Sequence, residues 1–491
     1  MKKYILLFLV FSLASALYFL ISDETPEGFV SMKNDQFILN NEVFQPIVIN
    51  YITSLQQDGK NLWVSSCKEY EKNAVHLPKV EQEYNENLFA EMTLIKDLGF
   101  NTVRIVGVGE PNINDKTEQL SLPSNNHNNN RTSILLNNDS TINVYLESIS
   151  NALKIVDRAG LKAIFLIRIR PGIISTEYLL TKFCQKFKNN TTLMAIDIYN
   201  EPLYFDKPEK SKQEVFGIVN HWKQIIKTYA PNHLMTIGLA GMREVFRWDP
   251  NILDVDFISY HPYEYEPEQV RNEIYWYGKY TEKSWIIGET AIPADNDSIT
   301  YEMQRLFAKN TLNQTFNCGG IGYSWWQYKD VDWHKYHANF MGLLTWNGET
   351  LNSKGKKVNG TLKPTASAFK NYVVSPDPSK CKCFKNYYNY SESKAFKLTG
   401  KILDEKNEPI EGAVVLAWNK NWSHSYHTVT KEDGSFELLG SYPFYHWMAS
   451  ATKYTTIRDD IDPQRAKNIE NYPTVDLKTL TVVPLPFLTE S

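Results

Sequence analysis

Two short apolar runs in this sequence each end at a glutamate. Residues 194–200 are mainly apolar and stop at Glu201, and residues 285–288 stop at Glu289. Runs of this kind are typical of buried parallel strands, whose carboxyl ends often carry functional side chains. A single glutamate beside a proline is common at protein surfaces and indicates little. A pair at two strand ends predicts two neighbouring carboxylates, which cleavage of a glycosidic bond requires.

The two carboxylates would have separate tasks in such a reaction. When the sugar configuration is retained, one carboxyl group acts as acid and then base, and the other acts as nucleophile, at a separation of roughly 5–5.5 Å. Their surroundings should differ, so that one is protonated and the other ionised near neutral pH. Strands four and seven of a closed barrel face each other closely enough across the lumen to permit that separation.

Strand-like and helix-like segments alternate between residues 46 and 326. Apolar runs predict eight strands, at residues 46–51, 102–106, 162–167, 194–200, 233–240, 255–263, 285–288 and 320–326. Apolar positions at helical spacing predict intervening helices, at residues 85–99, 141–160, 175–188, 212–229, 266–279 and 298–313. This alternation implies an α/β fold with a parallel sheet, and eight units close into a (β/α)₈ TIM barrel. A doubly wound open sheet is the alternative, but no glycine-rich phosphate loop follows the first strand.

The barrel domain is expected to span residues 23–374. A lead-in hairpin is predicted around Asn40 and Asn41, and a closing helix at residues 363–372. Residues 111–140 are rich in Asn, Ser and Thr, which predicts a solvated insertion in a loop on the active-site side.

Residues 375–395 are predicted to be a linker, because they include two prolines in Ser375–Pro378. From residue 396 the segments become short and strand-like, with turns at 407–408 and 433–434. This pattern predicts a small antiparallel β-sandwich, followed by a tail, over residues 396–491.

Further functional side chains fall at the predicted strand ends. They are Arg104 at the second strand, Asn200-Glu201-Pro202 at the fourth, His261-Pro-Tyr263 at the sixth, Glu289 at the seventh and Trp326-Gln-Tyr-Lys-Asp330 at the eighth. With these motifs in register, residues 46–372 resemble the retaining (β/α)₈ glycoside hydrolases, specifically the cellulase-like family 5.

The resemblance implies a role for each of these residues. Glu201 would be the acid/base and Glu289 the nucleophile. Asn200 would hold the sugar 2-hydroxyl group, and Trp326 would be the platform under the reacting sugar. Arg104 and Tyr263 would hydrogen-bond Glu289 and keep it ionised, since a cationic neighbour lowers a carboxyl pKa. His261 would line the same wall.

The chain departs from the family pattern at the third strand. Many members carry a histidine at its end, whereas residues 165–172 of this chain contain Arg168 and Arg170. Either arginine could fill that wall of the cleft, or the subsite could differ.

A second resemblance covers residues 400 to about 457. Gly400-Lys-Ile402, Pro409-Ile-Glu-Gly-Ala413 and Thr430-Lys-Glu-Asp-Gly-Ser-Phe436 resemble the carboxypeptidase regulatory-like (transthyretin-like) sandwich, which is usually an accessory module. Three tryptophans in this region, Trp418, Trp422 and Trp447, either pack within the sandwich or bind glycan.

Composition narrows the classes of ligand. A formal net charge of −4 offers no excess of positive charge for binding nucleic acid. No Ser-His-Asp triad pattern, nucleotide-binding glycine loop or His-x-x-x-His pair is found, so we expect neither a cofactor nor a catalytic metal. Five cysteines are too few for a disulfide scaffold, and Cys381-Lys-Cys383 is predicted to be structural or incidental rather than metal-binding.

The N-terminus predicts export. Residues 1–16 combine two lysines with an apolar run, and Ala14-Ser-Ala16 fits a signal-peptide cleavage site. The apolar stretch continues to Ile21, which is long enough for an uncleaved membrane anchor. We therefore assign residues 1–22 to a signal peptide or an anchor and expect an extracellular, periplasmic or membrane-anchored protein.

These patterns favour an exported retaining β-glycoside hydrolase that acts on a β-1,4-linked glucan or mannan. One alternative is a non-catalytic glycan-binding or adhesion protein with a degenerate barrel. Another is a transglycosylase that uses the same covalent intermediate. In each case a carbohydrate is the expected partner, and the oligomeric state stays open.

Overall fold

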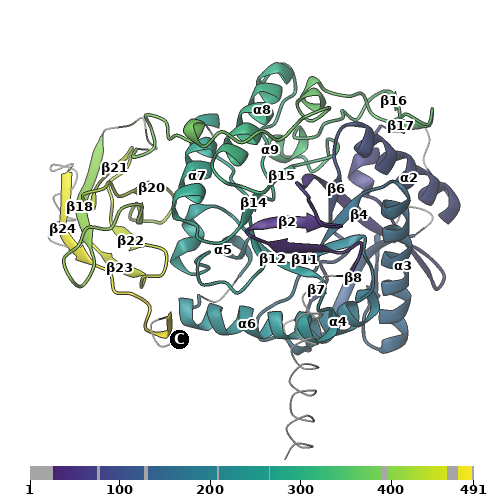
Figure 1. The fold of residues 1–491 in the computed structure, drawn as a ribbon, viewed down its shortest axis with the longest axis horizontal. Coiled ribbons are helices and arrows are strands. Elements are labelled where there is room, and N and C mark those ends of the chain that lie inside the picture. The colour runs from purple at the N-terminus through teal and green to yellow at the C-terminus, as the bar shows by residue number, and fades with distance from the viewer. Residues whose placement is uncertain are drawn as a thin grey trace, which may run out of the picture.

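The computed structural model describes residues 26–73, 78–114, 116–126, 131–206, 209–264, 266–389, 391, 393, 395–461 and 474–488. Its largest element is a closed barrel of eight parallel strands (Figure 1). The strands are β4 (Ile47–Asp58), β6 (Thr102–Val106), β10 (Lys162–Leu166), β11 (Leu193–Asn200), β12 (Leu234–Leu239), β13 (Phe257–Tyr260), β14 (Trp285–Ile287) and β15 (Gly322–Trp325). Parallel pairing of β15 with β4 closes the barrel, so the predicted TIM barrel is confirmed and the open sheet is excluded.

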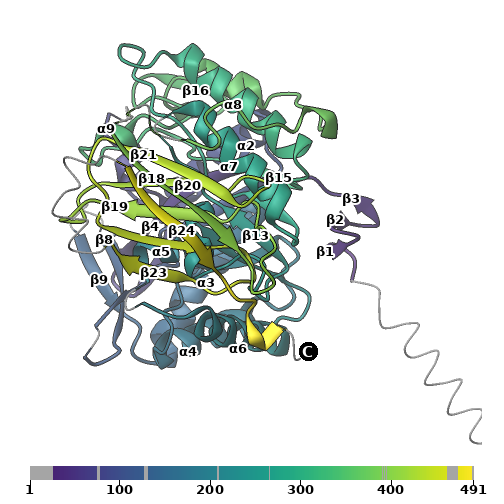
Figure 2. The ribbon, with the colours of Figure 1, turned by 90° about the vertical axis from the view of Figure 1, so that its left-hand side faces the viewer.

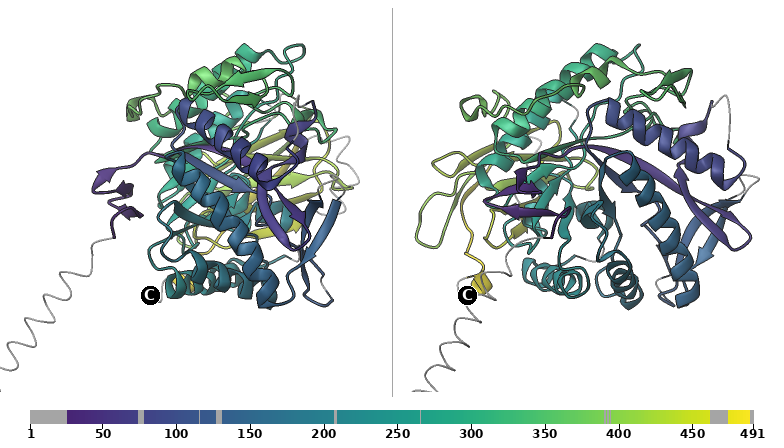
Figure 3. Two further views of the ribbon diagram at one scale, coloured as in Figure 1. Left: turned by 90° about the vertical axis from the view of Figure 1, so that its right-hand side faces the viewer. Right: turned by 45° about the vertical axis from the view of Figure 1, so that its right-hand side comes forward.

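Six long helices follow the strands and cover the outside of the barrel, where those of the first half of the chain lie side by side (Figure 3). They are α2 (Glu81–Asp97), α3 (Asp139–Arg158), α4 (Ile174–Phe187), α6 (Lys212–Tyr229), α7 (Pro267–Tyr280) and α8 (Tyr301–Asn317). Local sequence fixes their ends. A capping box between Ser211 and Glu214 begins α6, and Gly99, with a φ of 96°, follows the end of α2.

The predicted closing helix at residues 363–372 is wrong in length. Only a short 3₁₀ helix, η3 (Pro364–Ala368), forms there. Asn371 adopts a left-handed backbone with a φ of 63°, which ends helical structure. Phe369 still packs into the barrel wall against Trp325, with ring centroids 5.9 Å apart.

The insertion at residues 111–140 is not simply a solvated loop. It contains β7 (Asn112–Ile113), β8 (Leu120–Asn126) and β9 (Arg131–Leu135). Strand β4 continues beyond the barrel, where β5 (Asn61–Ser66) and β8 pair with it. This pairing satisfies backbone groups that the long β4 would otherwise leave open. Leu120 and Leu122 are buried and alternate with less buried neighbours, as in a strand. The polar composition of the surrounding residues made this pattern difficult to recognise in the sequence.

A small sheet closes the base of the barrel. It comprises β1 (Val30–Lys33), β2 (Gln36–Leu39) and β3 (Glu42–Val43), with the predicted hairpin turn at Asn40 and Asn41. Phe37 packs edge-on against Phe257, with ring centroids 5.0 Å apart. These β1–β3 strands project from one end of the barrel (Figure 2).

The C-terminal region forms the predicted sandwich, which lies beside the barrel near α5 (Pro202–Phe205) and α7 (Figure 1). One sheet has the order β21 (Ser435–Gly440), β18 (Phe396–Leu403) and β24 (Thr474–Thr481). The other has the order β20 (Ser425–Val429), β19 (Val414–Trp418), β22 (His446–Ser450) and β23 (Ile457–Asp460). The pairing is antiparallel except between β18 and β24, which run parallel. Apolar side chains such as Leu398, Val415 and Phe436 form its core.

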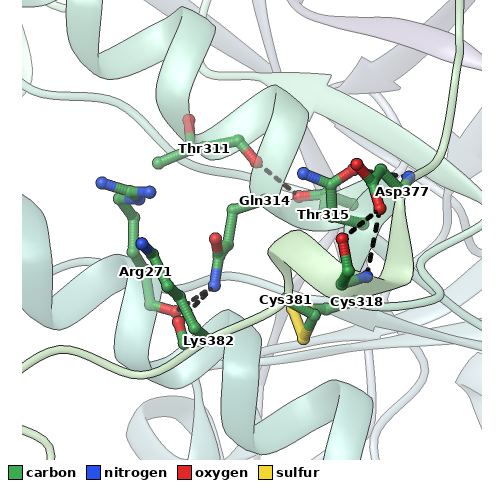
Figure 4. The surroundings of a disulfide bond; sticks show 10 residues. Arg271, Thr311, Gln314, Thr315, Cys318, Asp377, Cys381 and Lys382 are labelled. Carbon is green, nitrogen blue, oxygen red and sulfur yellow. Dashed lines mark hydrogen bonds between the residues drawn. A yellow bond between two sulfur atoms is a disulfide. The ribbon is translucent and has the colours of Figure 1, made fainter.

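The predicted linker at residues 375–395 is bound to the barrel rather than free. Cys381 forms a disulfide with Cys318 at the end of α8, and Gln314 donates a hydrogen bond of 2.9 Å to the Lys382 carbonyl (Figure 4). The sandwich is bound as well, since the Trp276 indole donates to the Gly412 carbonyl at 2.9 Å. The two domains therefore share an extensive contact surface.

The expected signal peptide or anchor at residues 1–22 lies outside the described residues. Within the described part of the chain, no helix has the length and apolar character needed to span a bilayer.

Candidate active site

The two glutamates meet at the carboxyl ends of the barrel strands. Glu201 directly follows β11, and Glu289 lies two residues beyond β14. Glu201 has a left-handed backbone with a φ of 47°, and its N–H donates to the Gly238 carbonyl at 2.8 Å. This conformation is uncommon for a residue other than glycine and is found where surrounding structure enforces it, as at functional sites.

The carboxylates are close together. One oxygen of Glu201 and one of Glu289 lie within 4.8 Å of each other and of a His261 ring nitrogen. His261 Nδ1 is 3.1 Å from Glu201 Oε1 and 3.6 Å from Glu289 Oε1. The separation fits a retaining pair and is shorter than the roughly 6.5–9.5 Å that inverting enzymes need to admit a water.

Arg104 connects Glu289 to the neighbouring strands. Its guanidinium donates to Glu289 Oε1 at 2.5 Å, Asp197 Oδ2 at 2.8 Å and Asn200 Oδ1 at 2.8 Å. Burial alone would lower the pKa of Arg104, but the carboxylates of Asp197 and Glu289 outweigh it and raise that pKa. Arg104 is thus a permanent buried cation that holds Glu289 and Asn200 in place.

The two glutamates differ in their hydrogen-bond partners. Glu289 accepts from Arg104 on one oxygen and from the Tyr263 hydroxyl on the other, at 3.1 Å. Burial raises the pKa of Glu289, while His261 and Arg104 oppose that rise. Among the described residues, Glu201 has no direct cationic hydrogen-bond donor, and burial raises its pKa to about 7. Glu201 is therefore suited to hold a proton, and Glu289 to be ionised.

His261 lies beside both carboxylates. Burial lowers the pKa of His261 to about 4, so the ring is neutral near pH 7. Two glycines make room for it: a Cβ at Gly238 would lie 2.5 Å from the ring, and one at Gly288 would lie 2.9 Å from its Nε2. These close approaches explain why strand-end positions here carry glycine.

Trp325 and Trp326 point to opposite sides, as alternation along a strand requires. Trp325 is fully buried against Phe307 and Phe369 in the outer layer. Trp326 is partly exposed. Its backbone N–H donates to the carbonyl of Thr290, the residue after Glu289, at 3.1 Å. Arg104 lies in the middle of β6 rather than at its predicted end and reaches Glu289 with its side chain, whereas the other residues predicted for the site lie at or just beyond the ends of their strands.

Sequence reasoning missed two members of this network. Asn50, in β4, donates from Nδ2 to the Gly288 carbonyl at 2.9 Å and to Ser324 Oγ at 2.8 Å, while its Oδ1 accepts from Arg104 at 2.9 Å. Asp197, in β11, pairs with Arg104 and is fully buried. The sequence contained a signal for Asp197, since it is an acidic residue inside an apolar strand. A charge buried there requires a partner of opposite charge.

Arg168 and Arg170 follow β10, the third barrel strand. The Arg168 guanidinium lies 5.0 Å from the centre of the Phe205 ring, and its charge opposes the burial that raises the pKa of Glu110. The Arg170 backbone N–H is bonded to Thr176 Oγ1 at 3.2 Å. Arg168 therefore lies on the wall beside the α5 segment that follows Glu201.

The spacing of Glu201, His261 and Glu289 would also allow contact with a metal ion. However, Arg104 is directly bonded to Glu289 and already supplies the positive charge that its carboxylate needs. A divalent ion at the same oxygens would lie beside a fixed guanidinium, which makes this donor set unfavourable for a cation.

No protein-family model and no curated protein sequence matches this chain. Solved structures with a similar barrel include a GH5_18 protein from Streptomyces cattleya in complex with GlcNAc, at 12% identity over 73% of this chain and 84% of that chain, with a TM-score of 0.46. An exo-β-1,4-mannosidase from Opitutaceae bacterium strain TAV5 is 16% identical over 69% of this chain and 61% of that chain, with a TM-score of 0.47. An endo-1,4-β-mannanase from Rhizomucor miehei is 14% identical over 61% and 90%, with a TM-score of 0.41.

Proposed function

We propose that this protein is a retaining β-glycoside hydrolase that works by double displacement. The observation that carries the proposal is the close approach of Glu201 and Glu289, within 4.8 Å, at the mouth of the barrel. An inverting enzyme needs a wider gap, which holds a water between the base carboxylate and the sugar, so the short separation supports one carboxylate as the nucleophile.

In the first step, the Glu289 carboxylate attacks the anomeric carbon while Glu201 gives its proton to the departing glycosidic oxygen. A covalent glycosyl ester of Glu289 forms and the aglycone leaves. In the second step, Glu201 takes a proton from water, and the resulting oxygen nucleophile displaces Glu289. The configuration is retained because inversion occurs twice.

The surrounding residues support these steps. Arg104 and Tyr263 aim the Glu289 carboxylate and keep it ionised. Asn200, held by Arg104, is positioned to bind the sugar 2-hydroxyl group, a contact that strengthens in the oxocarbenium-like transition state. Trp326 offers an aromatic face to the reacting sugar, and neutral His261 completes the wall without adding charge.

We further propose that the substrate is a β-1,4-linked glucan or mannan, on the basis of the sequence motifs shared with family 5 glycoside hydrolases. Turnover measured on a panel of glucans, mannans and xylans tests this choice. The N-terminal pattern supports export, and the motifs of residues 400–457 support a carboxypeptidase regulatory-like accessory role for the sandwich. Detection of the processed protein outside the cell checks the proposed export.

The decisive experiment is Glu289→Ala with and without azide. Turnover of an activated aryl β-glycoside should fall to the limit of detection, and azide should restore part of it by forming an α-glycosyl azide in the vacated space. Glu302→Ala, which removes an exposed carboxylate on α8, is the control and should have no effect.

Full activity in Glu289→Ala would contradict the proposal. Glycan binding without hydrolysis by the wild type would favour a degenerate glycan-binding barrel. Transfer to an added acceptor sugar in place of hydrolysis would identify a transglycosylase.

A further inference from the structure

A pocket lies where the sandwich meets the barrel, and we call it the boundary pocket. It has a volume of about 660 Å³, within the usual range for ligand sites. The barrel contributes residues from α5 and from the 3₁₀ helix η2 (Met242–Phe246), which follow strands β11 and β12. The sandwich contributes residues from β19, β22 and β23 and the turn after β19. Neither domain forms this pocket alone.

The sandwich side of the boundary pocket is an aromatic wall. Trp422 stacks on His446 with ring centroids 3.9 Å apart and planes 12° apart, and Trp418 lies 5.2 Å from Trp422. His446 is itself fixed by Asp460, at 2.6 Å from Nδ1. Trp422 nevertheless is 52% exposed. A rigidly held but open indole is unusual for a packing residue, whereas it suits a ligand with a flat apolar face.

The charged residues of the boundary pocket balance one another. Three arginines, Arg243, Arg247 and Arg458, face the acidic residues Glu209, Asp459 and Asp460, and a fourth acid, Glu244, is protonated near neutral pH because burial raises its pKa to about 8. Glu209 pairs with both Arg247 and Arg458, and Arg243 donates to the Tyr204 hydroxyl. The pocket therefore presents many hydrogen-bonding groups without a net charge, so it fits a neutral polar ligand better than an ionic one.

The barrel side of the boundary pocket adds a buried acid. Glu244 is only 1% exposed; its Oε1 accepts from the N–H groups of Leu203 and Ala240, whereas Oε2 has no hydrogen-bond partner among the described residues. Burial raises the pKa of Glu244 to about 8, so the carboxyl group is protonated near neutral pH. A protonated carboxyl group whose second oxygen lacks a partner can donate a hydrogen bond to a ligand hydroxyl group or accept one from it.

The chain leads directly from Glu201 into the wall of the boundary pocket. Leu203, which lines it, is two residues beyond Glu201 and is hydrogen-bonded to Glu244. Both barrel segments of the pocket follow the carboxyl ends of strands, so they lie on the same face as the glutamate pair. A chain of sugars bound at Glu201 and Glu289 could therefore continue toward the sandwich.

We propose that the boundary pocket binds a further sugar unit of the glycan that is cleaved at Glu201 and Glu289, with Trp422 as its stacking platform. This inference rests on the proposed function for the identity of the glycan. The sandwich then contributes directly to substrate binding, because an aromatic face packs on the C–H face of a pyranose while the charged rim bonds its hydroxyl groups.

The test compares Trp422→Ala with Tyr442→Ala. Tyr442 is a matched control, since it is also an exposed sandwich aromatic in contact with a histidine, His424, but it does not line the pocket. Binding of cellohexaose and mannohexaose is measured by calorimetry in a Glu289→Ala background, which prevents turnover. Trp422→Ala should weaken binding of the better hexaose about tenfold, as expected for loss of a tryptophan anchor, and Tyr442→Ala should not change it.

A second measurement uses otherwise wild-type protein and a single-sugar aryl β-glycoside, which is too short to reach the boundary pocket. Trp422→Ala should leave its kcat/KM unchanged while lowering that for the hexaose. Equal hexaose binding by Trp422→Ala and its parent, equal weakening by both variants, or no hexaose binding by the parent would each overturn the inference. If the aryl glycoside is not hydrolysed but Trp422→Ala still weakens hexaose binding, the proposed function fails and the pocket assignment stands.

Discussion

The two ends of the barrel use the same strands for opposite purposes. At the base, strand starts pack against the N-terminal sheet through apolar side chains: Val30, Phe37, Val48, Met194, Phe257 and Ile286. At the mouth, the strands and the residues that follow them carry buried polar groups: Asn50, Arg104, Asp197, His261 and Glu289. Apolar packing stabilises the fold through contacts that need no particular orientation, whereas a buried charge requires a specific partner in a specific place. The comparison indicates that the base stabilises the barrel, whereas the mouth holds the polar groups that the proposed reaction needs, as is general for this fold.

After Glu289→Ala, the largest effect on turnover should come from Glu201→Gln. Removing the acid/base should lower kcat/KM on a natural glycan roughly 10²–10⁴-fold, while an aryl glycoside with a good leaving group loses less in the first step.

The same variant should change the pH profile. Glu201 must be protonated, so wild-type kcat/KM should fall as the pH rises through its pKa of about 7. Glu289 must be ionised, and its pKa is also raised, so activity should fall as the pH drops through that pKa. Glu201→Gln should lose the alkaline limb for the activated aryl glycoside. An unchanged limb would show that another group supplies the proton.

Arg104→Met should come next, with a loss of roughly 10²–10³ in kcat/KM, because Glu289 loses its charged donor. The variant also leaves Asp197 buried without its cation, which should cost roughly 3–5 kcal/mol in the free energy of unfolding, measured by urea denaturation. Adding Asp197→Asn should recover part of the stability but none of the activity. Recovery of activity would mean that Arg104 acts only through folding.

Tyr263→Phe should have a smaller effect. It removes one neutral hydrogen bond to Glu289 Oε2 and leaves Arg104 in place, so kcat/KM should fall about tenfold. Stability should change little, since the ring stays. A loss as large as that of Arg104→Met would assign Tyr263 a greater share in holding the nucleophile than the structure indicates.

At the base, Phe37→Ala should leave turnover per folded molecule unchanged. The lost packing on Phe257 should lower the free energy of unfolding by roughly 3 kcal/mol, and Phe37→Leu should cost less than about 1.5 kcal/mol. Activity measured well below the melting temperature checks this. A fall in kcat of Phe37→Ala at that temperature would show that the base of the barrel also affects turnover.

The sequence predicted the barrel strands and helices well because their signals are local. Apolar runs and helical spacing gave the positions of β6, β11 and α6 to within a residue or so. The exceptions have physical reasons. The strands of residues 111–140 depend on pairing with an extension of β4, and the helix at residues 363–372 is shortened by Asn371.

The composition and order of residues determined that this chain forms a barrel followed by a sandwich, and which strand ends carry acids. Only the tertiary structure decided that Glu201 and Glu289 converge, that Arg104 bonds one and not the other, and that Asn50 and Asp197 belong to the same network. It also decided that Cys318 pairs with Cys381 and that two domains share the boundary pocket. These features join residues far apart along the chain, so no local pattern could specify them.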